Sequence, residues 1–145
     1  ASDVYKRQKE TPVNLAAEEG HLEVVKYLVE EANADAFIKQ GNGGTAFHEI
    51  AQRGWLDLVK YLAEKNPSAV DITNNYGFTA LDIAEKLCWL GADCSSVIEY
   101  LKTLSIHEAA KEGKLDVVKN LLEKNPASVN STDGIGQTPV YLAAR

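Results

Sequence analysis

The chain lacks several features that would assign it to a particular class of protein. It has no methionine, and no apolar run approaches the roughly 20 residues that a helix needs to span a bilayer. No signal-peptide pattern opens it. It has two cysteines, Cys88 and Cys94, where a secreted disulfide scaffold would use more of them, spread along the chain. We therefore expect two reduced thiols in a cytoplasmic protein with no membrane contact, and no metal site, because no histidine lies near the cysteines in sequence.

The balance of charge argues against a nucleic-acid partner. The formal net charge is −6, whereas phosphate binding depends on clustered lysine and arginine. The lysines are interleaved with glutamates, as in Glu64-Lys65 and Glu123-Lys124, a mixture typical of a solvated helix face.

A six-residue theme recurs along the chain at nearly fixed spacing. Its copies begin at Thr11, Thr45, Thr79, Leu104 and Thr138, in steps of 34, 34, 25 and 34 residues. Such a period indicates stacked structural units, none of which buries its apolar face alone.

Within each unit the pattern predicts two short helices. Each threonine stands where its hydroxyl can cap a first helix, and Gly20, Gly54 and Gly113 stand where a glycine in the left-handed conformation ends it. Apolar residues then follow at helical spacing, as in the stripe that begins with Leu22 and Val25. Stretches rich in turn residues, such as 73–77, precede the next threonine and fit an extended hairpin finger.

These features resemble the ankyrin repeat pattern T-P-L-H-x-A-A-x-x-G-H-x-x-V-V-x-x-L-L over residues 11–145. The resemblance implies an all-α helical repeat solenoid of stacked helix-turn-helix units joined by short β-hairpin fingers. It also implies a monomer that binds another protein and needs no cofactor. The expected units are 11–44, 45–78, 79–103, 104–137 and a partial unit 138–145.

Both ends of the chain depart from this pattern. Residues 1–10 resemble the translation of a transposase adapter used in preparing sequencing libraries, so we expect a disordered, non-native leader there. Because the fifth unit holds only a first helix, we expect the natural protein to extend further on both sides.

The third unit is irregular. Gly91 comes later than its counterparts, and only Lys102 and Thr103 separate the second helix from the next unit, so a finger is missing. Ser105 and Glu108 form an S-x-x-E capping box that lets the next helix start. Two interpretations remain open, namely a tolerated deletion inside a continuous stack and a joint between two sub-arrays.

No set of residues indicates catalysis. His48 and His107 match the structural histidine of T-P-L-H, and His21 matches the histidine that opens the second helix. Asn14, Asp82 and Tyr141 replace the structural histidine in the other units, where we expect looser hydrogen bonding. We expect no catalytic, cofactor-binding or metal-binding residues.

Ankyrin arrays use their hairpin tips and the variable pair that ends each first helix, and these positions line a concave groove. Aromatic residues flanking a tip are strong candidates for an interface anchor, although Phe78 has the alternative of packing over the next finger. Carried over by position, the expected partner-binding residues are Asn42, Gly44, Gln52, Arg53, Asn75, Tyr76, Phe78, Lys86, Lys111, Glu112, Ile135 and Gln137.

The sequence therefore predicts a protein–protein interaction module, a scaffold or adaptor without intrinsic catalysis. The alternative is a targeting or regulatory arm of a larger multidomain enzyme or secreted effector, whose catalytic domain lies outside this chain.

Overall fold

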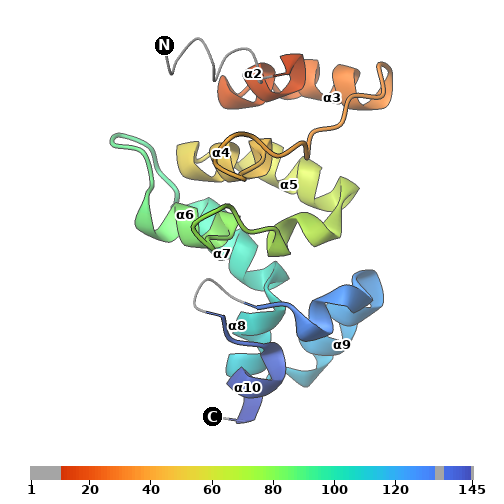
Figure 1. The fold of residues 1–145 in the computed structure, drawn as a ribbon, viewed down its shortest axis with the longest axis vertical. Coiled ribbons are helices and arrows are strands. Elements are labelled where there is room, and N and C mark those ends of the chain that lie inside the picture. The colour runs from red at the N-terminus through yellow and green to blue at the C-terminus, as the bar shows by residue number, and fades with distance from the viewer. Residues whose placement is uncertain (1–10, 133–135, 145) are drawn as a thin grey trace.

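A computed structural model of the chain describes residues 11–132 and 136–144 (Figure 1). The expected leader, residues 1–10, and Ile135 lie outside the described residues.

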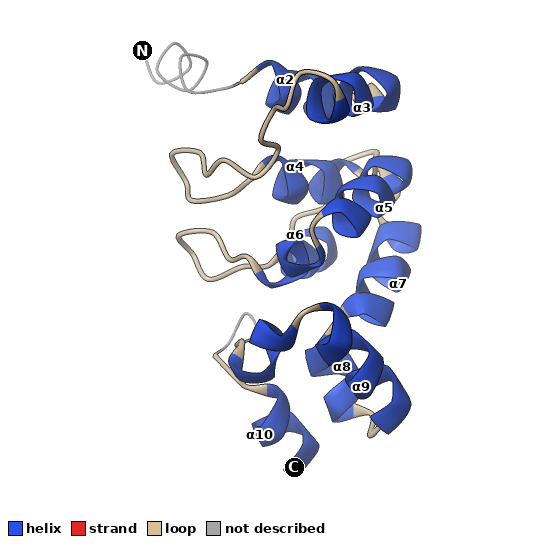
Figure 2. Ribbon diagram, turned by 90° about the vertical axis from the view of Figure 1, so that its right-hand side faces the viewer, coloured by secondary structure: helices blue, strands red, loops and turns tan. Residues whose placement is uncertain are grey.

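The described residues form a column of helix pairs, each lying beneath the one before it (Figure 1). Figure 2 shows the finger loops on one side, the first helices in the middle and the second helices on the other side. The first helices are α2 (Pro12–Glu18), α4 (Ala46–Arg53), α6 (Ala80–Lys86), α8 (Ile106–Lys111) and α10 (Pro139–Ala144). The second helices are α3 (Leu22–Glu30), α5 (Leu56–Lys65), α7 (Ser95–Leu104) and α9 (Leu115–Lys124), and the 3-10 helices η1 (Pro67–Asp71) and η2 (Pro126–Asn130) follow α5 and α9.

The threonine hydroxyls cap the first helices as predicted. In α4 the Thr45 hydroxyl accepts from the amide of Phe47 at 3.2 Å, and Nδ1 of His48 accepts from the Thr45 amide at 3.1 Å. In α6 a carboxylate replaces the histidine in the cap, because Oδ2 of Asp82 accepts from both the amide and the hydroxyl of Thr79. The expectation of looser hydrogen bonding at Asp82 is therefore wrong, since the Asp82 carboxylate closes the same capping box.

At Asn14 the expectation of looser hydrogen bonding is confirmed. The Asn14 side chain is fully buried, and its amide oxygen and nitrogen make no hydrogen bond within the described residues. A buried amide without partners costs free energy, which marks the first unit as less well satisfied than the second.

Two finger loops project from the upper part of the column (Figure 2). Each closes with two backbone hydrogen bonds. In the first finger the Gln40 amide donates to the Gly44 carbonyl and the Gly43 amide to the Gln40 carbonyl. In the second the Asn74 amide donates to the Phe78 carbonyl and the Gly77 amide to the Asn74 carbonyl. The amide of Asn75 also donates to the carbonyl of Asn42 at 2.8 Å, which ties one finger to the next. No residue within 11–132 or 136–144 has strand geometry, so the expected β-hairpins take the form of turns.

The insertion in the third unit is closed by a disulfide between Cys88 and Cys94. This corrects the expectation of two reduced thiols, because the loop that delays Gly91 also turns back and brings the cysteines together. Since disulfides persist in oxidising compartments, the expected cytoplasmic location loses the support that reduced thiols would have given it.

Helix α7 runs almost directly into α8, with a single residue between them. The Ser105 hydroxyl accepts from the Glu108 amide at 3.3 Å, which caps α8 as predicted. The reciprocal half of the box is replaced, because the Ser105 amide donates to the carbonyl of Lys102 instead. The finger loop seen in the two preceding units is absent between these two helices (Figure 2).

The buried core is continuous only through the third unit. It extends from Val13 to Leu101 and centres on Phe47 and Ile50 of α4. The residues buried beyond it lie outside that cluster, and α9 contains no buried residue. The first helices pack in series from α2 through α4 to α6, and α8 packs on α10, whereas α6 and α8 make few contacts.

The cation–π pairs between second helices end at the same place. The Lys26 ammonium lies 5.7 Å from the ring centroid of Tyr61 in the next unit, and Lys60 lies at the same distance from Tyr100. The equivalent positions at the next boundary hold Glu99 and Asn120, which cannot form this cation–π pair.

The glycine turns are a third feature that changes at the end of the third unit. A Cβ on Gly20 would meet the Trp55 ring at 2.9 Å, and one on Gly54 would meet the Asp93 carbonyl oxygen at 2.6 Å, so the next unit packs closely on each turn. Nothing lies within 4 Å of the same point on Gly91. From these three features we infer that a joint, and not a continuous stack, separates the third and fourth units.

Candidate partner-binding surface

The second finger carries the most exposed aromatic side chain of the expected site. The side-chain oxygen of Asn74 accepts from the amides of Tyr76 at 2.9 Å and of Phe78 at 3.1 Å, so the loop is held on both sides of its tip. Tyr76 is 75% exposed between these bonds. The finger therefore presents an aromatic ring on a backbone that its own hydrogen bonds hold in place.

Phe78 has a different environment. Its ring is half-buried with the Lys86 ammonium 5.3 Å from the centroid, and its carbonyl accepts from Nε2 of His48 at 3.1 Å. These contacts favour the alternative in which Phe78 belongs to the packing of the finger. Lys86 itself is exposed, at the end of α6.

His48 joins the helix cap to the second finger, and this role fixes its protonation state. Because Nδ1 accepts from Thr45 and Nε2 donates to Phe78, the ring is neutral with its proton on Nε2. Burial lowers the pKa of His48 below its ordinary value, against the weaker opposing effect of the carbonyls of Phe78 and Ile72. The side chain is 5% exposed, so it has a structural role.

The first finger offers less than expected. Asn42 is exposed, but its side chain accepts from the Gly44 amide at 2.8 Å. Asn75 of the second finger is also exposed, and its amide group donates to the Gly41 carbonyl of the first finger at 3.3 Å. Gly44 is buried, and we leave it out of the proposed surface.

The insertion of the third unit covers much of the residue pair at the end of α4, Gln52 and Arg53. The Gln52 side chain donates to the Leu87 carbonyl at 3.0 Å, and the Arg53 guanidinium lies 4.0 Å from the ring centroid of Trp89. Both residues are half-buried, and the Trp89 amide donates back to the Gln52 carbonyl at 3.0 Å. Sequence reasoning missed this because the family pattern has no loop at this position, although the late Gly91 marked an insertion.

The insertion itself exposes apolar surface. Trp89 is 49% exposed, and the neighbouring Leu90 is fully exposed, in a loop closed by the disulfide. Trp55 packs on the preceding unit, since it lies against Gly20 and its indole donates to the Glu18 carbonyl at 3.0 Å.

The fourth unit places its candidates at the far end of α8. Lys111 and Glu112 are exposed, with Lys111 3.8 Å from Glu108 and Glu112 2.6 Å from Lys114. The ammonium of Lys114 lowers the pKa of Glu112. Gln137 is half-buried, and Ile135 lies outside the described residues. The expected residues therefore form two groups, one above and one below the joint.

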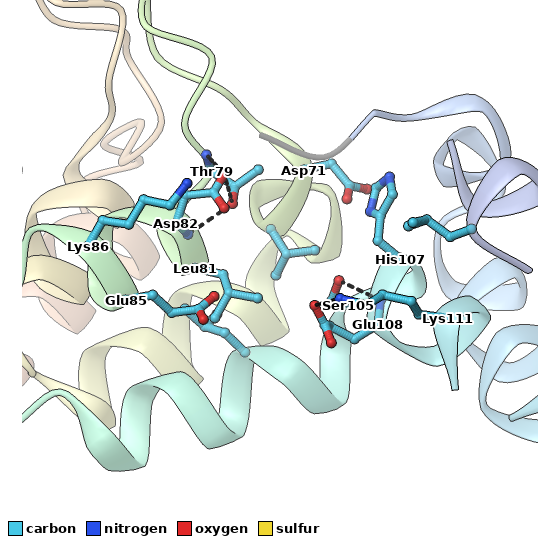
Figure 3. A pocket seen from close by; sticks show the side chains of 13 residues that line it. Asp71, Thr79, Leu81, Asp82, Glu85, Lys86, Ser105, His107, Glu108 and Lys111 are labelled. Atoms are coloured by element: carbon cyan, nitrogen blue, oxygen red, sulfur yellow. Dashed lines mark hydrogen bonds and ion pairs between the residues drawn. The ribbon is translucent and has the colours of Figure 1, made fainter. Parts of the chain in front are cut away.

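A cleft of about 260 Å³ lies at the joint, between α6 and α8 and above α7 (Figure 3). Carboxylates line it from three elements, with Asp71 on η1, Asp82 and Glu85 on α6, and Glu108 on α8. Burial raises the pKa of Asp71, although its carboxylate accepts from the Ser128 hydroxyl at 2.5 Å.

Other chemical functions find little support in the described ranges. Within them, no group of three or more histidine, cysteine or acidic side chains is placed to hold a metal ion. None of the helices they form is long and apolar enough to cross a membrane.

Helix pairs stacked in one direction, with finger loops along one edge, define a helical repeat protein. Comparison with protein families gives the particular class. A model described as ankyrin repeats (3 copies) matches residues 13–104, and one described as ankyrin repeats (many copies) matches residues 106–145. The chain belongs to the ankyrin repeat family, whose members are generally protein–protein interaction modules. The two matches meet at Ser105, where α7 gives way to α8.

Proposed function

We propose that this chain is a protein–protein interaction module without catalysis of its own, and that it binds a partner protein through the second finger and the adjoining ends of the first helices. The observation that carries the proposal is the exposed ring of Tyr76 on a finger held by Asn74. Rigid aromatic side chains give large contact area at low entropic cost, which is why they dominate interface energetics.

The surface around Tyr76 suggests the character of the partner. Asn75 is exposed beside Tyr76 on the finger, and the exposed Lys86 of α6 places its ammonium 5.3 Å from the Phe78 ring centroid. A partner suited to this surface has one apolar depression for an aromatic ring, within a rim of mixed charge.

Tyr76→Ala tests the proposal. Proteins captured by the wild-type chain should bind the variant with a dissociation constant weaker by about tenfold or more, as expected for loss of an interface anchor. The matched control is Tyr27→Ala, because Tyr27 is also exposed, at 64%, but lies on the second helix α3. Equal loss in both variants, or none in either, would rule out the finger as the binding surface.

A further inference from the structure

The cleft at the joint occupies the place of the missing finger. In the second unit, His48 donates to the carbonyl of Phe78 on the finger that follows it. His107 of α8 likewise donates to the carbonyl of Ser131 at 2.9 Å. Each structural histidine therefore holds the chain segment that enters beside the next first helix.

The third unit lacks both the histidine donor and the finger carbonyl that form this hydrogen bond. Its counterpart of the histidine is Asp82, whose side chain in its ionised form only accepts hydrogen bonds. The finger that would face it is absent, because α7 ends at Leu104 and Ser105 already caps α8. The cleft thus presents an acceptor where the second and fourth units present a donor.

Lys86 and Lys111 also line the cleft, so its four carboxylates outnumber its two ammonium groups and are incompletely neutralised. Asp82 bonds through Oδ2 to Thr79, and Glu85 makes no hydrogen bond or ion pair within the described residues. On the opposite wall Glu108 meets Lys111 at 3.8 Å, between side chains that are both partly exposed. Figure 3 shows Glu85 and Glu108 on opposite sides of the space between the helices.

The lining also suits the stem of a long side chain. Leu81 of α6, Leu101 of α7 and Val70 of η1 supply apolar surface around the same cleft. Lysine and arginine bury their methylene stems against such surface and carry the charge to a polar end. Arginine adds planar donors that match carboxylates on two sides.

We propose that the cleft between α6 and α8 binds an extended basic segment of a partner protein, which takes the place of the missing finger and inserts a lysine or arginine side chain toward Asp82 and Glu85. This inference deepens the proposed function, on which it rests, by adding a second contact site and the chemistry of what enters it. An incoming donor meets Asp82 where, in other units, the histidine meets a finger.

The probe for this inference is a displayed library of hairpin peptides with eight variable positions, selected on the wild-type chain. We expect lysine or arginine to be enriched at one position of the selected peptides. The double variant Asp82→Asn/Glu85→Gln should bind these peptides about tenfold more weakly, the loss expected for charged hydrogen bonds. The matched control Asp116→Asn/Glu123→Gln removes the same charge from exposed positions on α9 and should bind as the wild type does.

Folding of the variants is checked by circular dichroism and thermal unfolding. Asparagine at position 82 keeps an acceptor for Thr79, and Glu85→Gln alone alters no contact within the described residues. If the double variant fails to fold, Glu85→Gln alone should still weaken peptide binding by about threefold, since it leaves Asp82 in place.

Three results would overturn the inference. They are selected peptides without a basic residue, peptide binding that is unchanged in the double variant, and a chain that dimerises through the cleft so that the occupant is a second copy. Peptides that are lost on Tyr76→Ala and retained by the double variant would reject the cleft and leave the proposed function standing.

Discussion

At the scale of single residues, the histidine position of each unit decides how first helices and fingers are coupled. His48 closes the cap of α4 with one ring nitrogen and holds the Phe78 carbonyl with the other. Asp82 closes the cap of α6 but has no donor for a finger. One substitution at a repeated position thus accompanies the loss of a whole loop.

The neutral, buried state of His48 predicts a pH dependence of stability. Because burial holds its pKa in the folded protein below the ordinary value near 6.5, the unfolded chain binds protons more readily. The stability that His48 contributes is present above pH 6.5 and is lost as pH falls toward the pKa in the folded protein. Lys39 acts in the same direction and Asp82 opposes it, both more weakly than burial.

His48→Gln should lower the free energy of unfolding at pH 7 by roughly 1–3 kcal/mol, since it disrupts two buried hydrogen bonds. Urea unfolding between pH 5 and 7.5 should show a flatter pH dependence in this variant than in the wild type. His21→Gln, at an exposed position, is the control and should leave that dependence intact. An identical pH dependence in His48→Gln would show that another group is responsible.

Sequence was most informative at this scale where a residue acts on its near neighbours. The threonine caps and the left-handed glycines Gly20, Gly54 and Gly113 follow from local backbone chemistry, and the structure confirms them. The disulfide and the covering of Arg53 by Trp89 could not be predicted, because both depend on the path of an insertion that the repeat pattern does not describe.

At the scale of elements, the packing of one unit on the next is concentrated at the glycine turns. Gly54 and Gly113 both have a positive φ, +80° and +71°, so alanine is strained at either position. They differ in surroundings, because only Gly54 is covered by the next unit, at the Asp93 carbonyl.

Alanine substitutions at these two glycines separate backbone strain from packing. Gly113→Ala should cost roughly 1–2 kcal/mol of unfolding free energy from the left-handed conformation alone. Gly54→Ala should cost a further 1–3 kcal/mol or so, since the backbone of Asp93 must move to admit the methyl group. Thermal and urea unfolding of both variants provide the measurement, and equal costs would contradict the packing that we describe.

The absence of a finger between α7 and α8 followed from counting residues, because two residues lie between Leu101 and Leu104 where 16 lie between Leu28 and Thr45. The effect of the missing finger on the packing of the helices could not be predicted from residue counts. Whether α8 packs on α6 depends on side chains in both helices, such as Glu85 and Glu108, whose charges face the same space.

At the scale of the whole molecule, we propose that the array is two stacks that meet at Ser105. The continuous core, the lysine–tyrosine pairs and the covered glycines all end with the third unit. The finger with Tyr76 belongs to the upper stack, and the cleft lies between the two.

Native-state hydrogen exchange on the wild type and on Gly54→Ala tests the joint most directly, because exchange reports the opening of each helix separately. If the stacks are energetically distinct, the variant should raise exchange throughout α2–α7 by the factor set by its loss of stability. Exchange in α8–α10 should stay within about twofold of the wild type. An equal increase in α8–α10 would mean that the array opens as one cooperative unit and would contradict the joint.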